Sequence, residues 1–356
     1  SSNAGNKDTA KTDEKFTIKT VVKDKTATIY ITVNEKAFES ELKTATVANP
    51  MNLKIELPLE TILKQLREQL NNKVNVIVTL PNSFVNNKKI KCNDLVLEKS
   101  VLAQAQTYKK SITVSIKNAE DKLVYQWSIA SKDLAKATKN SAIYLNVAVN
   151  TVKDNADIKK LIAKDTKNTD GIVITYTQKN KLTVQASTKI YVGEQAGIKA
   201  GKKVYVYRYN ELTNKLETLK GGYGYVVDKD GYITLNMISG GRYVILAKEA
   251  SSKVITSLLN QITVTKSVSL NVGKTSTIKV ILPNCLEKVS TLKTATQFPC
   301  IGAVTVTYTS SNKNVATVGK TTGKITAKKK GKTTITATVT LYSGKVKTFK
   351  TSVVVK

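Results

Sequence analysis

The chain has 356 residues, a length that predicts two or three domains at roughly 100–200 residues per domain. Apolar residues make up 41% of it, enough for globular cores, which excludes wholesale disorder. Histidine is absent, so imidazole catalysis and histidine-metal sites are excluded, and no stretch approaches the ~18 consecutive apolar residues of a membrane span. Lysine and arginine number 57 against 26 acidic residues, which gives a formal net charge of +31.

The positive charge comes almost entirely from lysine. Only Arg67, Arg208 and Arg242 are arginines. Specific readout of phosphates or bases usually recruits the planar fork of arginine, so this bias argues against a nucleic-acid partner. Scattered lysines are typical of a solvated surface that keeps a secreted protein soluble. AT-rich codon usage in the source genome is an alternative explanation.

The first 15 residues are predicted to lie outside any domain. Residues 1–4 resemble the scar left when an affinity tag is cut away, and we expect a native signal segment to have preceded them. Residues 5–15 are polar, charged and without hydrophobic period, which predicts a linker.

Residues 16–138 predict a β-rich module that contains two helices. Apolar residues alternate with a period of two over 28–33, 53–57, 74–80 and 111–116, which predicts strands. One helix is expected to begin after Pro58 and a second to cover 98–108, about 39 residues further along. The apolar face of the first would be formed by Leu59, Ile62, Leu63, Leu66 and Leu70. Two matching strand–helix–strand units suggest a duplicated element.

The only tryptophan lies on a further predicted strand, 123–129. Trp127 alternates there with polar positions, which places it on the core face. Stacking on a sugar ring is the alternative role for this side chain.

Residues 139–248 predict an antiparallel β-sandwich module. Strands are expected at 143–149, 171–176, 189–192, 204–209, 223–227, 232–235 and 242–246, with one short helix at 157–163. Tight spacing by glycine and Asx-type turns favours antiparallel pairing. The two N-terminal blocks form either one domain or two. Residues 249–261 are expected to connect them to the rest of the chain.

Residues 262–356 predict strands only. Alternation over 304–309 and 334–339, with polar turns around Gly323 and Gly331, fits one immunoglobulin-like β-sandwich of about 95 residues. The fold class is therefore mostly β: β-rich N-terminal structure with short helices, then a C-terminal sandwich.

This C-terminal segment strongly resembles the bacterial immunoglobulin-like domain, group 2. The pieces that carry the resemblance are Tyr308-Thr309-Ser310-Ser311-Asn312, Val315-Ala316-Thr317-Val318, Gly323-Lys324-Ile325-Thr326-Ala327, Gly331 and Thr334-Ile335-Thr336-Ala337. The family implies a bacterial surface protein or adhesin, where such domains often serve as spacers. Residues 284–302 depart from the pattern as an insertion that carries two cysteines.

The upstream region is similar to a module that precedes such domains in surface proteins of anaerobic Firmicutes. The similarity rests on the pieces Leu57-Pro58-Leu59-Glu60, Leu97-Glu98, Val204-Tyr205-Val206-Tyr207-Arg208-Tyr209-Asn210, Asp228-Lys229-Asp230-Gly231-Tyr232 and Gly241-Arg242-Tyr243-Val244. It implies an exported, modular, cell-surface location and no particular activity.

Cys285 and Cys300 are predicted either to form a disulfide or to remain free thiols. Cys285 and Cys300 bracket the insertion, and a disulfide between them would stabilise the fold by about 3 kcal/mol on the chain-entropy model. An exported location permits such a bond, although surface proteins of low-redox anaerobes seldom rely on one. Cys92 is expected to pack as a small apolar residue. Three scattered cysteines without histidine do not predict a metal site.

Two further patterns have a structural and a functional reading. Tyr205, Tyr207 and Tyr209 share one face of a strand, which is either packed within the fold or free to stack on a glycan. Asp228 and Asp230 resemble the start of a calcium loop, but Ser239 stands where the twelve-residue pattern needs a glutamate. The segment is therefore predicted to be a hairpin turn.

Charge is concentrated in the C-terminal domain. Residues 262–356 contain 16 lysines, no arginine or aspartate and only Glu287, a net charge of +15. Lys328, Lys329, Lys330 and Lys332 surround the turn at Gly331 and are candidate contacts for a polyanion such as a cell-wall polymer or an acidic glycan. A spacer whose charge only prevents self-association is the alternative.

Together these patterns predict an exported, non-catalytic cell-surface protein with a binding, adhesion or spacer role. No catalytic, cofactor-binding or metal-binding residue is predicted. Partners would be anionic wall polymers, acidic glycans, or host or neighbouring surface proteins. A polysaccharide- or wall-acting hydrolase is the first alternative, since paired carboxylates need not be close in sequence. A nucleic-acid binder is the second.

Overall fold

The computed structural model describes residues 10–12, 15–179, 181–218, 225–292 and 300–356. The predicted tag scar and most of the predicted linker lie outside these residues. Residues 10–12 of that linker form a short strand, β1 (Ala10–Thr12), which pairs antiparallel with β2 (Phe16–Lys23). The linker prediction is therefore wrong at this point, because the backbone of residues 10–12 extends the edge of a sheet.

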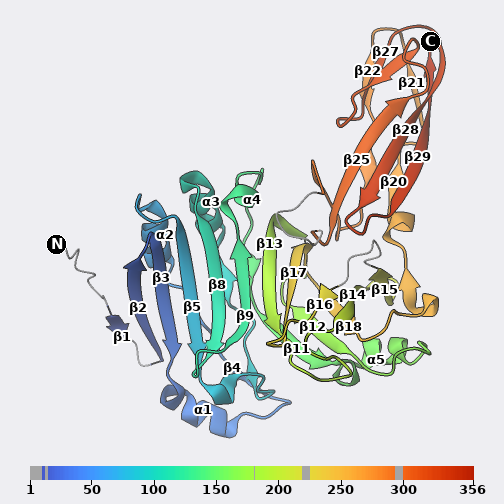
Figure 1. Ribbon diagram of the computed structural model, residues 1–356. Helices are drawn as coiled ribbons and strands as arrows, with labels where there is room; N and C mark the ends of the chain where they lie inside the picture. Colours follow the sequence, from blue (N-terminus) through green and yellow to red (C-terminus); the bar gives the residue numbers. More distant parts are fainter. Residues whose placement is uncertain (1–9, 13–14, 180, 219–224, 293–299) are drawn as a thin grey trace.

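The N-terminal half of the described chain is built on one large mixed sheet (Figure 1). Eight strands of the described chain lie in it in the order β1-β2-β3-β5-β8-β9-β13-β17. Beyond β1 and β2, their bounds are β3 Thr26–Val33, β5 Lys73–Leu80, β8 Ser111–Asn118, β9 Leu123–Ile129, β13 Lys181–Tyr191 and β17 Tyr232–Ser239. β3 pairs parallel with β5, and β5 with β8, in two strand–helix–strand units that contain the predicted helices and the strands predicted after them. The strands predicted before the helices are not part of these units: residues 53–57 form no strand, and Val96–Leu97 pairs with Ile143–Tyr144 outside this sheet.

The helices of these units pack on one face of the sheet. They are α2 (Leu59–Arg67) and α3 (Lys99–Tyr108), and both contribute to a core that includes the fully buried Ile62 and Leu102. Since α2 ends at Arg67, Leu70 does not share its buried face and is 79% exposed, contrary to prediction. Trp127 is buried in the same core, where its indole N–H donates to the carbonyl of Leu145 at 2.9 Å.

Shorter elements complete this half. The remaining α-helices are α1 (Glu39–Thr44), α4 (Ser131–Leu134) and α5 (Ala156–Ile162), and 3-10 helices cover Glu35–Phe38, Asn82–Phe84, Val152–Asp154, Ser252–Val254 and Leu258–Gln261. Two small pairs join β4 (Met51–Asn52) to β6 (Ile90–Lys91) and β7 (Val96–Leu97) to β10 (Ile143–Tyr144).

The two predicted N-terminal blocks share this sheet. β13 pairs with β9 on one side and with β17 on the other, so strands from residues 139–248 continue the sheet of residues 16–138. A separate sandwich confined to residues 139–248 is therefore not what the structure contains. Core contacts explain why the two blocks share one sheet. Thr188 of β13 pairs with Trp127 of β9, and the hydroxyl groups of Thr188 and Tyr176 are hydrogen-bonded at 2.7 Å.

A second sheet covers the β13–β17 end of the first. Within the described residues its strand order is β11-β12-β18-β14-β15-β19, and β16 pairs with β14. The bounds are β11 Val147–Thr151, β12 Ile172–Tyr176, β14 Lys203–Asn210, β15 Lys215–Thr218, β16 Tyr225–Val226, β18 Arg242–Leu246 and β19 Ile255–Thr256. Residues 223–224 of the predicted strand 223–227 lie outside the described residues. The expected connector contributes β19 and the buried Val254, so it packs against this sheet.

The C-terminal domain is an immunoglobulin-like β-sandwich, as predicted. One sheet has the order β21-β29-β28-β25-β24 and the other the order β22-β27-β26, with β20 and β23 as an additional pair among the described residues. Their bounds are β20 Thr263–Val264, β21 Ser267–Leu270, β22 Thr275–Thr277, β23 Val280–Ile281, β24 Glu287–Lys288, β25 Ala303–Ser310, β26 Ala316–Val318, β27 Lys324–Ala327, β28 Gly331–Leu341 and β29 Val346–Val355. Alternate residues of β28 are buried, from Thr333 to Leu341.

This domain is fixed to the N-terminal half by its insertion. Ile301 forms a parallel bridge with Met237: the Ile301 amide donates to the Asn236 carbonyl at 2.8 Å, and the Ile238 amide donates to the Ile301 carbonyl at 2.9 Å. Leu286 and Ile301 are fully buried. We call these contacts between 236–239 and 285–303 the joint. In Figure 1 the sandwich rises from the end of the large sheet where β13 and β17 lie.

No helix among the described residues is long and apolar enough to cross a membrane.

Candidate binding site

A broad groove lies beside the joint. It has a volume of about 1130 Å³, and its walls come from strands of the large sheet, from the segment after β9 and from residues 287–292 of the insertion. Both halves of the molecule therefore contribute to one concave surface. We call it the interdomain groove.

Lysines dominate the charge of the interdomain groove. Those among its described lining residues are Lys73, Lys132, Lys136, Lys139, Lys181 and Lys288. All six are exposed. Lys132, Lys136 and Lys139 follow β9, Lys73 and Lys181 begin β5 and β13, and Lys288 comes from the C-terminal domain.

Two carboxylates offset part of this charge. Glu287 Oε2 lies 2.6 Å from Lys181 Nζ, across the joint. Burial raises the pKa of Asp133, while the neighbouring Lys132 and Lys136 act in the opposite direction. Against six lysines, these two acids leave a clear positive excess in the described lining.

Part of the bed of the groove is polar because it belongs to the face of the sheet turned away from the helices, whereas apolar side chains such as Leu182, Val184 and Ile238 line another part. Pairing places Thr113 opposite Ser128, Ser128 opposite Ser187, and Ser187 opposite Asn236. Directly paired residues share a face, so these side chains form one row across four strands. The row was not predicted from the sequence because most of β13 was not, although the residues from Lys181 to Tyr191 alternate in burial as a strand should.

The predicted polyanion contacts lie elsewhere. Lys328, Lys329, Lys330 and Lys332 are all exposed around the turn between β27 and β28, at the end of the sandwich opposite the joint. β28 runs eleven residues from this turn to the joint, about 33 Å at ~3.3 Å per residue. The lysine turn and the interdomain groove are separate surfaces.

The predicted tyrosine row is part of the interior. Tyr207 and Tyr209 are 4% and 1% exposed and belong to a second core with α5, while Tyr205 is half-buried against it. The Tyr207 hydroxyl accepts from the Ala250 amide at 2.9 Å. The glycan-contact reading is therefore wrong for Tyr207 and Tyr209, because both faces of β14 are covered.

The three cysteines are free thiols, so the predicted disulfide between Cys285 and Cys300 is not formed. The two lie in different surroundings: Cys285 Sγ is 4.0 Å from Glu217 Oε1, whereas Cys300 lines the interdomain groove near Asp133. Burial raises the pKa of Cys285 to about 11 and that of Cys300 further. Both are therefore thiols at neutral pH.

Cys285 borders a buried ion pair at the joint. Glu217, 1% exposed, accepts from Arg208 Nη1 at 3.3 Å and from Asn210 Nδ2 at 3.0 Å, both on Oε1. Its Oε2 is buried without a hydrogen-bond partner in the described structure. Burial raises the pKa of Glu217, and Arg208 and Asn210 oppose that effect.

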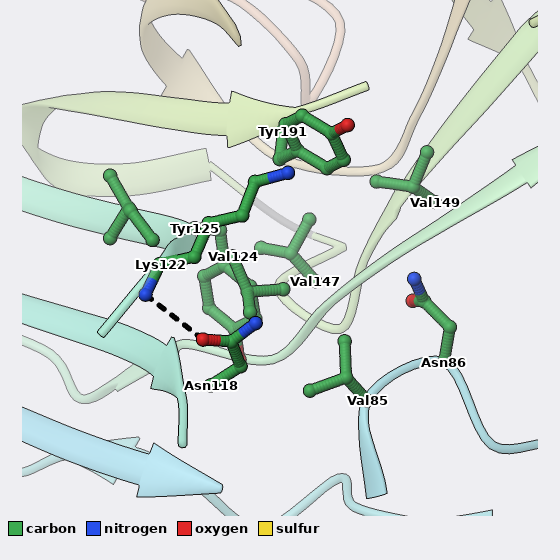
Figure 2. Close-up of a pocket in the computed structure, with 10 residues that line it drawn as sticks. Val85, Asn86, Asn118, Lys122, Val124, Tyr125, Val147, Val149 and Tyr191 are labelled. Atoms are coloured by element: carbon green, nitrogen blue, oxygen red, sulfur yellow. Dashed lines mark hydrogen bonds between the residues drawn. The ribbon is translucent and has the colours of Figure 1, made fainter. Parts of the chain in front are cut away.

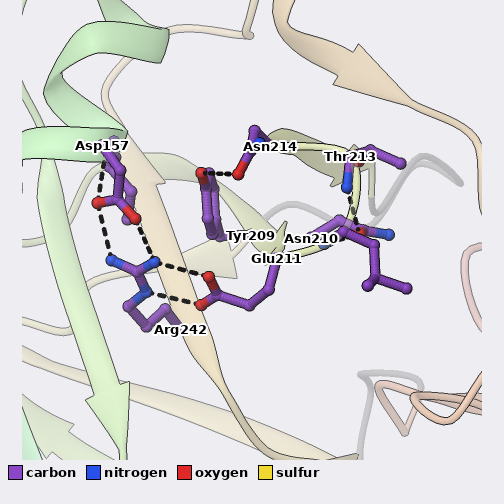
Figure 3. A network of polar contacts seen from close by, with 9 residues as sticks. Asp157, Tyr209, Asn210, Glu211, Thr213, Asn214 and Arg242 are labelled. Carbon is purple, nitrogen blue, oxygen red and sulfur yellow. Dashed lines mark hydrogen bonds and ion pairs between the residues drawn. The ribbon is translucent and has the colours of Figure 1, made fainter.

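A second polar network lies on the face of the second sheet that packs against α5 (Figure 3). Arg242 of β18 donates to both oxygens of Asp157 and both of Glu211, at 2.5–2.9 Å. Its guanidinium also lies 4.7 Å from the ring centre of Tyr209. Hydrogen bonding from Arg242 lowers the pKa of Asp157. Each charge has a partner, so the network reads as a structural clamp between α5 and β18.

The small cavity of about 130 Å³ shown in Figure 2 is lined by apolar and polar side chains in about equal measure. Val85, Val124, Val147 and Val149 line it, and Lys122 Nζ lies 3.7 Å from the ring centre of Tyr191 at its edge. It is too small to hold a polymer segment. Among the described residues, no three Cys, Asp or Glu side chains gather as metal ligands.

Comparison with known proteins identifies the C-terminal domain. Residues 288–349 match the bacterial Ig-like domain (group 2), in agreement with the resemblance drawn from sequence pieces. No curated protein matches the chain.

One similar solved structure is a C-terminal 282-residue fragment of intimin in complex with the intimin-binding domain of the translocated intimin receptor. Sequence identity is 13%, and the TM-score is 0.18. The alignment covers 47% of this chain and 57% of that fragment. The C-terminal sandwich of this chain is thus a bacterial Ig-like domain of group 2, defined by the family match over residues 288–349.

Proposed function

We propose that this chain is an exported bacterial cell-surface protein with a binding role and no catalytic activity. The observation that carries the proposal is the interdomain groove, which a bacterial Ig-like domain and the N-terminal half together line with six lysines and a row of hydroxyl groups. A spacer needs no such shared concave surface. The exported location is inferred from the occurrence of group 2 Ig-like domains in bacterial surface proteins.

The hydrolase alternative requires two carboxylates held on either side of a scissile bond. The described lining of the groove offers Asp133 and Glu287, and Glu287 is already paired with Lys181. Asp133 has lysines as its charged neighbours. This arrangement favours attraction of an anion over proton transfer to a leaving group.

A binding screen of the full chain tests the proposal. We expect retention of anionic wall polymers and acidic glycans at low salt, weaker retention at physiological salt, and little retention of neutral polysaccharides, because exposed charges are screened beyond about 8 Å at physiological ionic strength. Retention of no polymer at low salt would overturn the proposal, as would equal retention of neutral and anionic ones.

The absence of catalysis is a separate prediction. Incubation with peptidoglycan and plant polysaccharides should release no reducing ends or fragments above a heat-denatured control. Reproducible turnover that disappears in Asp133→Asn, in a variant that still unfolds cooperatively, would establish the hydrolase alternative in its place.

A further inference from the structure

We propose that the interdomain groove is the binding site for one extended strand of an anionic, hydroxyl-rich polymer that carries a negative charge at each repeat. This deepens the proposed function by naming its site and ligand class. The lysine turn is a different surface, at the other end of the sandwich.

Lysines line the interdomain groove from both halves of the molecule. Lys132, Lys136 and Lys139 lie in the segment after β9, and Lys288, whose ammonium donates to the Thr321 carbonyl at 2.9 Å, lies in the C-terminal domain. A strand lying between them would meet positive charge on both sides. Concave surfaces with charge of one sign concentrate the field and attract oppositely charged ligands.

The bed of the groove carries a row of hydroxyl groups. Thr113, Ser128 and Ser187 are half-buried there, and their hydroxyls can donate and accept hydrogen bonds with sugar hydroxyls, whereas Asn236 at the end of the row is buried. From β5 to β17 the groove crosses five strands, about 19 Å at ~4.8 Å per strand. That length accommodates several repeats of an extended chain and exceeds what a single small anion needs.

The lining of the groove favours a polysaccharide or polyol phosphate over a nucleic acid. Sequence-tolerant nucleic-acid grooves stack bases on aromatic side chains. None of the described lining residues of the groove is aromatic, and none is arginine. Lysine supplies a point charge on a flexible stem, which suits irregularly spaced anions better than bases held in register.

The experiment uses the full chain and titrates four soluble probes at low and physiological salt. They are a poly(glycerol phosphate), a polyuronate, neutral dextran and single-stranded DNA. The first two share the proposed chemistry and distinguish a phosphate source from a carboxylate source. The groove variant replaces Lys132, Lys136, Lys139 and Lys288 by Gln. The control variant makes the same replacement at four exposed lysines of α5 and the segment after it, Lys159, Lys160, Lys164 and Lys167.

We expect saturable binding of one or both anionic polymers by the parent and by the control. The groove variant should lose at least about tenfold in affinity at low salt, since each lysine that contacts the polymer releases a counterion. A second variant, Ser187→Asp, should weaken binding by placing a carboxylate on the bed. Thermal unfolding verifies that each variant folds.

The outcomes are distinguishable. If the parent binds neither anionic polymer, both the proposed function and this inference fail. If the parent binds but the groove and control variants bind as tightly as the parent, the inference alone fails. Preferential binding of single-stranded DNA would overturn the ligand class, and equal losses in both lysine variants would reduce the effect to net charge.

Discussion

At the scale of single residues, Arg242 makes the densest set of polar contacts on the second sheet. It reaches Asp157 of α5 and Glu211 beyond β14, and it covers the ring of Tyr209 (Figure 3). Bidentate pairs of this kind are stronger than single contacts between exposed charges. The clamp therefore fixes a seven-residue helix that is too short to be stable alone.

Replacement of Arg242 by Gln should lower the free energy of unfolding by about 1–2 kcal/mol at neutral pH, given the partial exposure of its partners. Arg242→Lys keeps the charge but not the planar guanidinium, so its free energy of unfolding should lie between those of the parent and Arg242→Gln. The pKa of Asp157 is lowered in the folded state, so its stabilising contribution is present above the unfolded pKa of about 3.9 and is lost as the pH falls through the folded value.

Thermal or denaturant unfolding from pH 7 down to pH 3 measures this effect. The difference in the free energy of unfolding between the parent and Arg242→Gln should narrow as the pH falls. An unchanged difference at low pH would show that packing on Tyr209, and not the ion pairs, accounts for the stabilisation.

Residue-scale prediction from the sequence succeeded where a side chain follows the period of its own strand. Trp127 is in the core for that reason. It failed for the tyrosine row, since alternation on β14 shows that two faces exist but not that α5 and the residues after β18 cover the second one. The disulfide prediction failed similarly: closeness in sequence did not reveal that Cys285 and Cys300 lie in different surroundings.

At the scale of elements, Gly302 decides how closely β17 approaches the insertion. Its φ is +97°, and a Cβ built there would lie 2.8 Å from the Cys285 carbonyl oxygen and 3.0 Å from the Ser239 Cβ. Gly273 also has a left-handed φ, +83°, but nothing lies within 4 Å of its Cβ position. A side chain at Gly273 would add backbone strain alone, whereas a side chain at Gly302 would add both backbone strain and a steric clash.

Gly302→Ala should therefore destabilise the joint by about 1–3 kcal/mol more than Gly273→Ala destabilises its turn, because only the former adds overpacking to strain of about 1–2 kcal/mol. Differential scanning calorimetry of the full chain compares them. Equal losses of stability in the two variants would mean that the joint accommodates the added methyl group without strain and does not hold the two halves together.

The sandwich itself is expected to fold alone. A fragment of residues 262–356 has two facing sheets and its own buried residues, so it should unfold cooperatively. Its melting temperature should be lower than in the full chain, since Leu286 and Ile301 lose their cover. A fragment without a cooperative transition would show that the joint is required for folding.

Elements were predicted best where pairing is local. The helices α2 and α3, the strands β5 and β8 that follow them, and the C-terminal strands followed from period and turn residues, whereas alternation over 53–57 wrongly predicted a strand. The division between the N-terminal blocks did not follow from these patterns, because the pairing of β9 with β13 joins residues about 60 positions apart and leaves no mark in composition. Most of β13 was missed, although it alternates through eleven residues.

At the scale of the whole molecule, charge is divided unevenly. Residues 262–356 carry +15 of the total of +31, so the sandwich has more than twice the charge density of the rest. The lysine turn places part of this charge far from the joint. We expect it to attract polyanions weakly and with little selectivity, in contrast to the saturable binding proposed for the groove.

The isolated fragment of residues 262–356, once shown to fold, separates these contributions because it lacks most of the groove. Its retention on immobilised wall teichoic acid should be measurable at low salt and lost at physiological salt. Replacing Lys328, Lys329, Lys330 and Lys332 by Gln should abolish it. Equal retention of parent and variant, or none at low salt, would leave the turn as a solvated surface.

The groove could not have been predicted from sequence. Its six lysines come from four separate segments of the chain, and they meet only because β5, β8, β9 and β13 are neighbours and the insertion folds back onto β17. Net charge favoured a polyanion as the proposed ligand, whereas the location of the proposed site required tertiary structure.

The most direct test of the account is a calorimetric titration of the full chain with a soluble anionic wall polymer, at low and at physiological salt. The account predicts a saturable isotherm at low salt, an affinity that falls steeply with salt, and no release of polymer fragments afterwards. Absence of saturation at low salt, or an affinity indifferent to salt, would contradict it.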